Sequence, residues 1–283
     1  LRYLKKKKIV LLSIAAVAIS TALLVTVASL FTAFIAAVES GASDYLGDII
    51  IQPPARFAHG DELIKKLTES KSISAATVVL STNGLIHLGS GNVKAVSIWG
   101  IDIENRSKVT GLKSNLLLQK SAASEPKFTF DGNESDAMPA FVGIGLIAEP
   151  NAATDEYDLP AISSSVGVGS GAVITAGCLE KDAGAESSAS MLHSRSVEIR
   201  IADILFTSVY EIDERFVFVP VDRLSAALGI DMEKPADIIH IKCAPGVSAA
   251  NAVSVVTQIW SAFAEKTLNW PRFYIADTEI MTA

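Results

Sequence analysis

Residues Ile9–Val38 read IVLLSIAAVAISTALLVTVASLFTAFIAAV, an uncharged run of about thirty residues that directly follows the basic cluster Lys5–Lys8. Roughly 20 such residues suffice to cross the hydrocarbon core of a bilayer as a helix. Because a single segment in lipid satisfies its backbone hydrogen bonds only as a helix, we expect a transmembrane helix here. The run is longer than the membrane core requires, so its last turns are expected to emerge as a stalk.

The positive charges before this run set its expected orientation. Arg2 and the four lysines stay on the cytoplasmic side, since basic flanks do so in membrane proteins. We expect residues 1–8 to be a cytoplasmic segment, residues 9–38 the membrane helix with its stalk, and the chain after about residue 39 to be periplasmic or otherwise extracytoplasmic, in a bacterial inner membrane. The alternative is a signal peptide cleaved near Ala37, giving a secreted binding protein, but signal-peptide apolar cores span only about 7–15 residues.

Charge and composition exclude some classes of partner. The chain has 24 basic and 31 acidic residues, and the first eight residues hold five of the basic ones, which leaves 19 against 31, a net charge of −12, for residues 9–283. A nucleic-acid partner needs a basic face, so none is expected. No full zinc pattern occurs, and the histidines at 59, 87, 193 and 240 are predicted to be surface or packing residues. We expect neither a metal nor a cofactor.

Catalytic motifs are also missing. There is no Gly-x-Ser-x-Gly and no His-Glu-x-x-His. The glycines at 167, 169 and 171 are not followed by the Lys-Ser or Lys-Thr of a phosphate loop, so a hairpin turn is the preferred interpretation. The carboxylate pairs Asp155-Glu156 and Asp213-Glu214 are interpreted as solvated. We therefore expect a non-catalytic protein.

The two cysteines, Cys178 and Cys243, lie far apart in the sequence. An oxidising compartment would permit a disulfide between them, but buried free thiols are common and the sequence does not show that the two residues meet. The sequence leaves their pairing open.

Beyond the stalk, two similar strand–helix–strand halves can be recognised from apolar periodicity. The first half comprises a strand at Asp48–Gln52, a helix at Asp61–Ser70 and strands at Ile73–Ser81, Gly84–His87 and Val93–Ile98, with turns at Asn83-Gly84 and Gly89–Gly91. The second comprises a strand at Asp237–Lys242, a helix at Ser248–Lys266 and a strand at Arg272–Ile275. Two such halves fit a split α+β sandwich in which both contribute to one antiparallel sheet.

The stretch between the halves is predicted to be β-rich. Strands are expected at Phe141–Ile144, Val166–Ile174, Val197–Ile201, Ile204–Val209 and Phe216–Pro220, and a short helix at Asp222–Leu228. Glu180–Ser190 contains no large apolar residue and is predicted to be an exposed loop. The fold class is therefore α+β, with a first half at residues 39–119, an inserted β-rich subdomain at 120–231 and a second half at 232–283.

One block is specific enough to compare with a family. Phe206–Leu224 reads FTSVYEIDERFVFVPVDRL and resembles the G-x-Y-E-x-D-x-x-x-V-F-V-P-L region of permease subunits in the lipoprotein-releasing, MacB and FtsX superfamily of ABC transporters. Phe141–Ala148 resembles the I-V-G-x-x-L-A segment of that family, Val168–Gly171 its G-D-x-V turn, and the basic start with the first helix its opening. Ser170 and Ser208 depart from the family pattern, which has Asp and Gly there.

The resemblance implies a membrane permease subunit whose periplasmic domain lies between the first two of four transmembrane helices. That domain combines a porter-like half, built from ferredoxin-like parts, with an inserted β-rich half. Such subunits work as homodimers or heterodimers with a separate cytoplasmic ABC ATPase and release or export lipoproteins or other amphipathic cargo. Their helices would pass ATPase-driven motion to the periplasmic domain as a rigid body. The resemblance leaves the cargo, the direction of transport and the dimer type open.

The resemblance also nominates residues. Tyr210, Asp213, Phe216 and Pro220 match the family block and are interpreted as fold-maintaining rather than ligand-binding. In lipoprotein-releasing members a hairpin of the inserted half recruits a periplasmic carrier. The corresponding stretch here makes Cys178, Met191 and Arg195 candidates for a partner-binding loop.

A function of a different class also fits the sequence. In an FtsX-like bitopic scaffold or signalling protein, the helix only tethers a domain that binds another periplasmic protein, without transport. Three further apolar segments after Ala283 and a neighbouring ATPase gene would favour transport, whereas a stop codon there would favour the tether.

Overall fold

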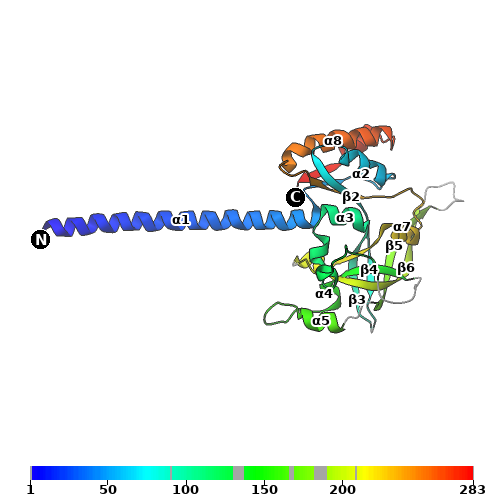
Figure 1. Ribbon diagram of the computed structural model, residues 1–283, viewed down its shortest axis with the longest axis horizontal. Helices are drawn as coiled ribbons and strands as arrows, with labels where there is room; N and C mark the ends of the chain where they lie inside the picture. Colours follow the sequence, from blue (N-terminus) through cyan, green and yellow to red (C-terminus); the bar gives the residue numbers. More distant parts are fainter. Residues whose placement is uncertain are drawn as a thin grey trace. The chain divides into compact units, whose positions relative to one another are not determined.

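The computed structural model describes residues 2–89, 91–129, 137–165, 169–181, 190–207 and 209–282. The chain forms two compact units, Leu1–Ser43 and Asp44–Ala283. The first holds most of helix α1, which spans Arg2–Leu46 and so continues past the predicted end at Val38 (Figure 1). The last residues of α1, Asp44–Leu46, belong to the second unit. The segment Leu12–Ile35 of α1 has a mean hydropathy of 2.3 and is long and apolar enough to cross a membrane. The predicted N-terminal apolar helix is thus confirmed.

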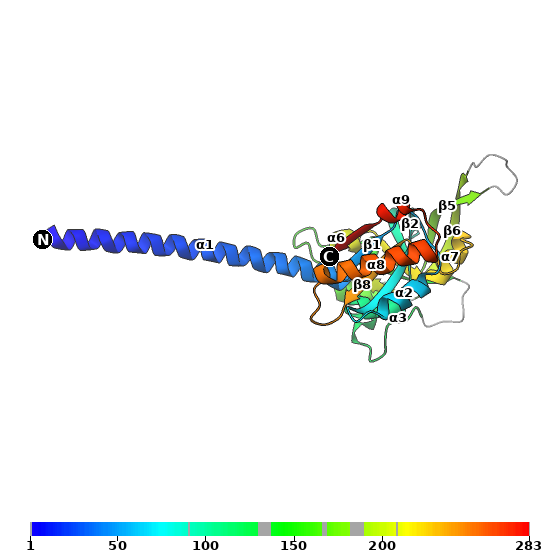
Figure 2. The same cartoon turned by 90° about the horizontal axis from the view of Figure 1, so that it is seen from above.

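The second unit contains the predicted split α+β fold. One half is β1 (Ile49–Gln52), α2 (Gly60–Thr68) and β2 (Ile73–His87), and the other is β8 (Ile238–Cys243), α8 (Ala249–Lys266) and β9 (Glu279–Thr282). The strands lie in the order β2-β8-β1-β9, all antiparallel, which is the arrangement of a ferredoxin-like split fold. Helices α2 and α8 lie side by side against this sheet (Figures 1 and 2). The α+β fold class is confirmed.

The remaining strands close a small barrel. They are β3 (Val93–Ile101), β4 (Met138–Gly143), β5 (Gly171–Lys181), β6 (Ser190–Leu205) and β7 (Phe216–Pro220). Their order is β3-β7-β4-β6-β5-β2, and β2 also pairs with β3, which closes the ring. Alternate residues point inward, so Val217 and Val219 of β7 pack in the barrel core, which α7 (Val221–Leu228) covers.

Strand β2 belongs to both parts of the unit. Its first part, from Ile73 to Val79, pairs with β8, and its last part, from Gly84 to His87, pairs with β5. The two cores, one under α2 and α8 and one inside the barrel, are therefore joined by one continuous strand. The division at residues 119 and 231 stays a prediction.

Short helices complete the described fold. They are α3 (Ile103–Val109), the 3₁₀ turns η1 (Leu112–Asn115) and η2 (Gln119–Ser121), α4 (Ile144–Ile147), α5 (Leu159–Ser165), α6 (Tyr210–Asp213) and α9 (Arg272–Ala276).

Several sequence predictions of local structure are wrong. Asn83-Gly84 is not a turn but part of β2, where Gly84 pairs with Val96 of β3 and Ala176 of β5. A Cβ on Gly84 would lie 2.4 Å from the Thr175 oxygen, so only glycine permits this close approach of β5. The predicted strand at Arg272–Ile275 is helix α9, which Pro271 precedes with a φ of −67° that suits a helix start.

The predicted loop at Glu180–Ser190 is shorter than expected. Strand β5 continues to Lys181 and β6 begins at Ser190, and these two residues are paired, because backbone pairing in a hairpin does not require apolar side chains. Residues 182–189 lie outside the described part of the chain. The two strands predicted at Val197–Ile201 and Ile204–Val209 are one strand, β6, which ends at Leu205.

Candidate functional site

The most unusual polar feature of the second unit lies where α1 ends. Only Gly47 and Asp48 separate Leu46 at the end of α1 from Ile49 at the start of β1. Gly47 has a φ of 87°, the left-handed conformation with which helices commonly terminate. A Cβ on Gly47 would lie 2.8 Å from the Ile241 oxygen and 3.0 Å from Cγ1 of Val109. The connection is therefore short, and its glycine is required for both conformation and space.

The last turn of α1 inserts an aromatic ring into the domain. Tyr45 is only 5% exposed, and its ring stacks on those of Trp99 and Phe218 at centroid distances of 6.1 and 6.3 Å. Arg106 of α3 and His240 of β8 complete this group. We call Tyr45, Trp99, Arg106, Phe218 and His240 the joint cluster.

Arg106 binds the end of α1 directly. Its Nη2 donates a hydrogen bond of 2.7 Å to the Tyr45 carbonyl, and its Nη1 is hydrogen-bonded to Nδ1 of His240. The Tyr45 carbonyl is among the last of the helix, which lack partners within the helix and form the negative end of its dipole. The guanidinium also lies over the rings of Tyr45 and Trp99, 5.4 Å from each centroid. A buried cation thus caps α1.

Burial fixes the charges in the joint cluster. It lowers the pKa of Arg106 to about 10, so the guanidinium stays charged at neutral pH. Burial, aided by the nearby charge of Arg106, holds the pKa of His240 well below its usual range, so the imidazole is neutral and its Nδ1 accepts. Burial also raises the pKa of the Tyr45 hydroxyl, which stays protonated.

Asp48 fastens the other side of the connection. Its backbone N–H donates to the Ile241 oxygen at 2.8 Å, and its carboxylate accepts from Nζ of Lys242 at 3.0 Å and from the Cys243 N–H at 2.8 Å. The first residue after Gly47 is therefore held to β8. Cys243 itself is a buried free thiol, so it forms no disulfide with Cys178, whose side chain lies outside the described part of the chain.

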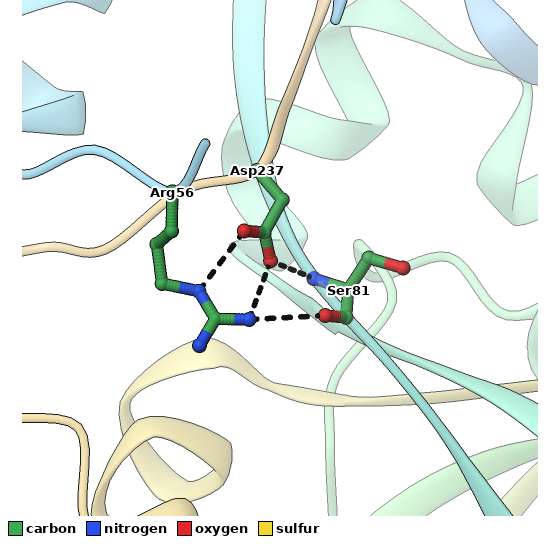
Figure 3. Close-up of polar contacts among 3 residues, drawn as sticks. All are labelled: Arg56, Ser81 and Asp237. Atoms are coloured by element: carbon green, nitrogen blue, oxygen red, sulfur yellow. Dashed lines mark hydrogen bonds and ion pairs between the residues drawn. The ribbon is translucent and has the colours of Figure 1, made fainter. Parts of the chain in front are cut away.

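A second polar group joins the two cores (Figure 3). Arg56, between β1 and α2, donates from Nε and Nη2 to both carboxylate oxygens of Asp237, each at 2.9 Å, and from Nη2 to the Ser81 oxygen at 3.2 Å. The Ser81 N–H donates to Asp237 at 2.8 Å. Ser81 lies where β2 leaves β8 and approaches β5. This partly buried bidentate pair therefore braces the strand shared by both cores.

Replacing Gly47 with alanine is expected to lower the free energy of unfolding by about 2–3 kcal/mol, since an L-residue is strained at this φ and its Cβ meets the Ile241 backbone. Gly89→Ala is the matched control, because Gly89 has a φ of 85° but no atom within 4 Å of its added Cβ. Chemical denaturation of both variants separates the clash from the strain. Equal losses of unfolding free energy in the two variants would show that the space around Gly47 is not tight.

The stability of the domain should fall in acid partly because of His240. With an unfolded-state pKa near about 6.5 and a lower folded-state pKa, neutral His240 contributes stability that is full above about pH 6.5 and lost as the pH falls below it. The slope reaches at most about 1.4 kcal/mol per pH unit. Denaturation of His240→Gln at several pH values should give a flatter profile of stability against pH than the wild type. Parallel profiles for His240→Gln and wild type would contradict this.

The two family-like segments pack directly against each other. Phe141 and Val142 of β4 pair with Phe218 and Val217 of β7. A Cβ on Gly143 would lie only 2.3 Å from the Asp213 oxygen, and one on Gly145 only 2.7 Å from Cγ of Glu214. These glycines let α6 sit against the end of β4, which gives both segments a structural reason for their residues.

The four residues nominated from the family block lie in different surroundings. Tyr210 is 65% exposed at the start of α6. The interpretation of Asp213 as solvated is wrong: its carboxylate is buried, because it accepts from the Thr207 N–H and hydroxyl at 2.7 and 2.8 Å. Phe216 packs edge-on against Trp99 at 4.7 Å, next to the joint cluster, and Pro220 ends β7 and is the N-cap residue of α7. A fold-maintaining role stays a prediction for them.

The candidate partner loop is the β5–β6 hairpin (Figure 2). The side chains of Cys178 and Met191 lie outside the described residues. Arg195 is partly buried, and its guanidinium lies about 3.1 Å from the Cβ position of Gly229, at the C-terminal end of α7. It therefore contacts a helix end within the domain, and a partner-binding role for all three residues stays a prediction. Among the described residues, no group of three or more His, Cys, Asp or Glu could hold a metal ion.

Comparison with known proteins gives structural likenesses at low identity. No family model matches the chain, and no curated protein matches it. The periplasmic region of MacB from Actinobacillus actinomycetemcomitans is similar over 85% of this chain and 90% of its own, with 12% identity and a TM-score of 0.46. The extracellular domain of the noncanonic ABC-type transporter YknZ from Gram-positive bacteria covers 83% of this chain and 98% of its own, with 9% identity and a TM-score of 0.43.

A domain of a putative permease protein from Porphyromonas gingivalis covers 85% of this chain and 90% of its own, with 12% identity and a TM-score of 0.38. These three similar structures are thus a periplasmic region, an extracellular domain of an ABC-type transporter and a domain of a putative permease.

Proposed function

We propose that this chain belongs to an ABC-transporter permease subunit, in which α1 crosses the membrane and residues 44–283 form a non-catalytic extracytoplasmic domain. The proposal is supported by the candidate span, by the ferredoxin-like split fold with its inserted barrel, and by the family-like segments that pack together at β4 and α6. The observation that carries it is the joint cluster, because a simple tether needs no buried arginine on its last carbonyls.

The proposed mechanism is mechanical. ATP hydrolysis on a separate cytoplasmic subunit tilts the membrane helices, and the last turn of α1 moves with them. Arg106, Tyr45 and Asp48 hold that turn to α3 and β8, so it cannot turn freely without breaking buried hydrogen bonds. The bidentate Arg56–Asp237 pair keeps the two cores together. The domain then follows as a rigid body.

The expected partners follow from this role. They are a cytoplasmic ABC ATPase, a second permease subunit in a homodimer or heterodimer, and a lipoprotein or other amphipathic cargo, with or without a periplasmic carrier. We expect the lysines at the N-terminus to lie in the cytoplasm, because basic flanks of membrane helices do so. A reporter enzyme active only outside the cytoplasm, fused after the domain, tests this orientation.

Purification of the intact protein from its native membranes tests the proposal. We expect an ABC ATPase to co-purify and to hydrolyse ATP in the complex, and the complete gene to encode three more apolar segments. Absence of any ATPase, or turnover of a small substrate by the domain itself, would refute the permease assignment.

A flexible insertion distinguishes a helix that transmits motion to the domain from a helix that only tethers it, as in an FtsX-like scaffold. A short Gly-Ser insertion between Leu46 and Gly47 should abolish complementation of a deletion strain, because the domain no longer follows α1. The same insertion in the β2–β3 turn at Gly89 is the control, since no atom lies within 4 Å of its added Cβ. Full complementation by the first insertion would favour the tether.

A further inference from the structure

A cavity of about 380 Å³ lies next to α6, and neither the joint cluster nor the proposed transmission of motion uses it. Its walls include Asp155, Glu156, Tyr157, Leu159, Phe206 and Tyr210. Its volume is within the range of small-molecule sites, and its lining mixes aromatic faces with carboxylates. This combination selects one class of ligand.

Aromatic side chains form the body of the cavity. Tyr157 and Phe206 meet edge to face at 6.0 Å, and Leu159 lies beside them. Tyr210 projects from α6 with 65% of its surface exposed. The faces of such rings are electron-rich and attract ammonium or guanidinium groups within about 6 Å. These rings have no equally strong attraction for anions.

Carboxylates give the cavity a negative field. Tyr157 has a raised pKa because of its burial and then because of the charges of Glu214, Asp213 and Asp155. A hydrogen bond from Tyr210 to Glu214 is the main reason that the pKa of Tyr210 is raised. The basic groups near these side chains are Arg215, which acts in the opposite direction on Tyr210, and Lys94, which donates to the Gly145 oxygen at 2.8 Å.

A glycine in α4, Gly145, allows these groups to come close together. Gly145 has no side chain, which leaves room for Glu214 and for the Tyr157 hydroxyl, 2.7 and 3.1 Å from where its Cβ would be. Beyond the cavity, the second unit as a whole carries a net negative charge, which disfavours anionic ligands. With the five basic residues and Glu39 of the first unit set aside, residues 44–283 hold 19 basic and 30 acidic residues, a net charge of −11.

We propose that this cavity binds an organic cation, whose ammonium or guanidinium group lies between Tyr157 and Tyr210 and whose apolar body packs on Phe206 and Leu159. Glu214 and Asp155 supply the opposite charge. The site does not depend on the permease assignment, since it follows from the lining of the cavity and from Glu214, which acts on the lining residues Tyr157 and Tyr210. The cation is either a small molecule or a basic side chain of another protein, which present the same chemistry to the rings.

Saturation-transfer difference NMR on the intact protein in nanodiscs of zwitterionic lipid tests the proposal, with empty nanodiscs subtracted. The probes are choline, its neutral isostere 3,3-dimethylbutan-1-ol, and N-acetylarginine methylamide. We expect choline or the arginine derivative to bind and the neutral alcohol to bind at least about fivefold more weakly, and binding to weaken near about 1 M salt. Whichever cation binds tighter identifies the source of the ligand.

Two variants and one control make the result specific. Tyr157→Leu and Glu214→Gln should each weaken cation binding by about threefold or more. Tyr274→Leu removes a partly exposed tyrosine of α9, outside the cavity, and should change nothing. Because Glu214→Gln changes no volume, it tests the site even if Tyr157→Leu unfolds the loop. Equal binding of the neutral alcohol, equal loss in Tyr274→Leu, or no binding of either cation would overturn the proposal.

Discussion

Replacing Arg106 with alanine is expected to lower the free energy of unfolding of the extracytoplasmic domain by about 3–5 kcal/mol. The change removes the donor to the Tyr45 carbonyl and the partner of His240, and it leaves a hole among three aromatic rings. Buried polar groups without partners cost about 1–3 kcal/mol each. Chemical denaturation followed by tryptophan fluorescence measures the effect, since Trp99 belongs to the joint cluster.

Lys108→Ala is the matched control, because Lys108 is an exposed residue of the same helix α3. Its effect should stay within about 0.5 kcal/mol. Arg106→Met separates stability from coupling, since methionine fills the space without donors and apolar replacement of a buried charge is often nearly neutral. We expect Arg106→Met to fold and to leave the ATPase active, but to lose function in cells. Wild-type stability of Arg106→Ala would show that the buried cation does not hold the end of α1.

Replacing Gly143 with valine is expected to cost at least about 3 kcal/mol and to displace α6. The added Cβ would lie 2.3 Å from the Asp213 oxygen and 2.9 Å from its carbonyl carbon, and neither backbone atom can move as a flexible side chain would. The Tyr210 side of the cation cavity should therefore be lost as well. Thermal unfolding measures the first effect and probe binding the second.

Gly171→Val controls for the loss of a strand glycine, because a Cβ there would come no closer than 3.9 Å to its neighbour Oε1 of Glu198. It should be tolerated within about 1 kcal/mol. If Gly143→Val were as stable as Gly171→Val, the close packing of the two family-like segments would not explain their sequences.

Strong local periodicity made much of the fold predictable. The apolar run predicts α1. The apolar stripe that includes Ala252, Val256 and Trp260 predicts α8 and the face of α8 that is buried in the domain core. Strand β7 was predicted at its observed bounds, because alternation along Phe216–Pro220 sends the valines into the barrel and the phenylalanines out of it. In such elements each residue's environment follows from its own neighbours in sequence.

The joint cluster could not be predicted because its members come from distant segments. Tyr45, Arg106 and His240 meet only when β8 pairs with β1 and α3 packs beside them. An arginine in a polar stretch normally indicates a solvent-exposed position. The available signal was the Asp102 cap, whose carboxylate accepts from the Glu104 and Asn105 N–H groups, with Ile103, Arg106 and Val109 on one face of the helix that follows.

The barrel was missed for a similar reason. The barrel closes because β2 pairs with β3 along one edge and with β5 along the other. Gly84 lies where both pairings meet, but Asn83-Gly84 is also the sequence typical of a hairpin turn. A glycine required for close backbone approach and a glycine required for a turn look alike in sequence. Only the pairing register of the strands in the folded structure distinguishes the two roles.

Hydrogen–deuterium exchange at the joint tests the central claim most directly. The measurement compares the intact protein in complex with its co-purified ATPase, with ATP trapped and with ADP, at the backbone amides of Gly47–Gln52 and Ile103–Thr110. If α1 transmits motion to the domain, exchange at these amides should differ between the two nucleotide states, and Arg106→Met should abolish the difference. Identical exchange in both states for the wild-type complex would contradict the account.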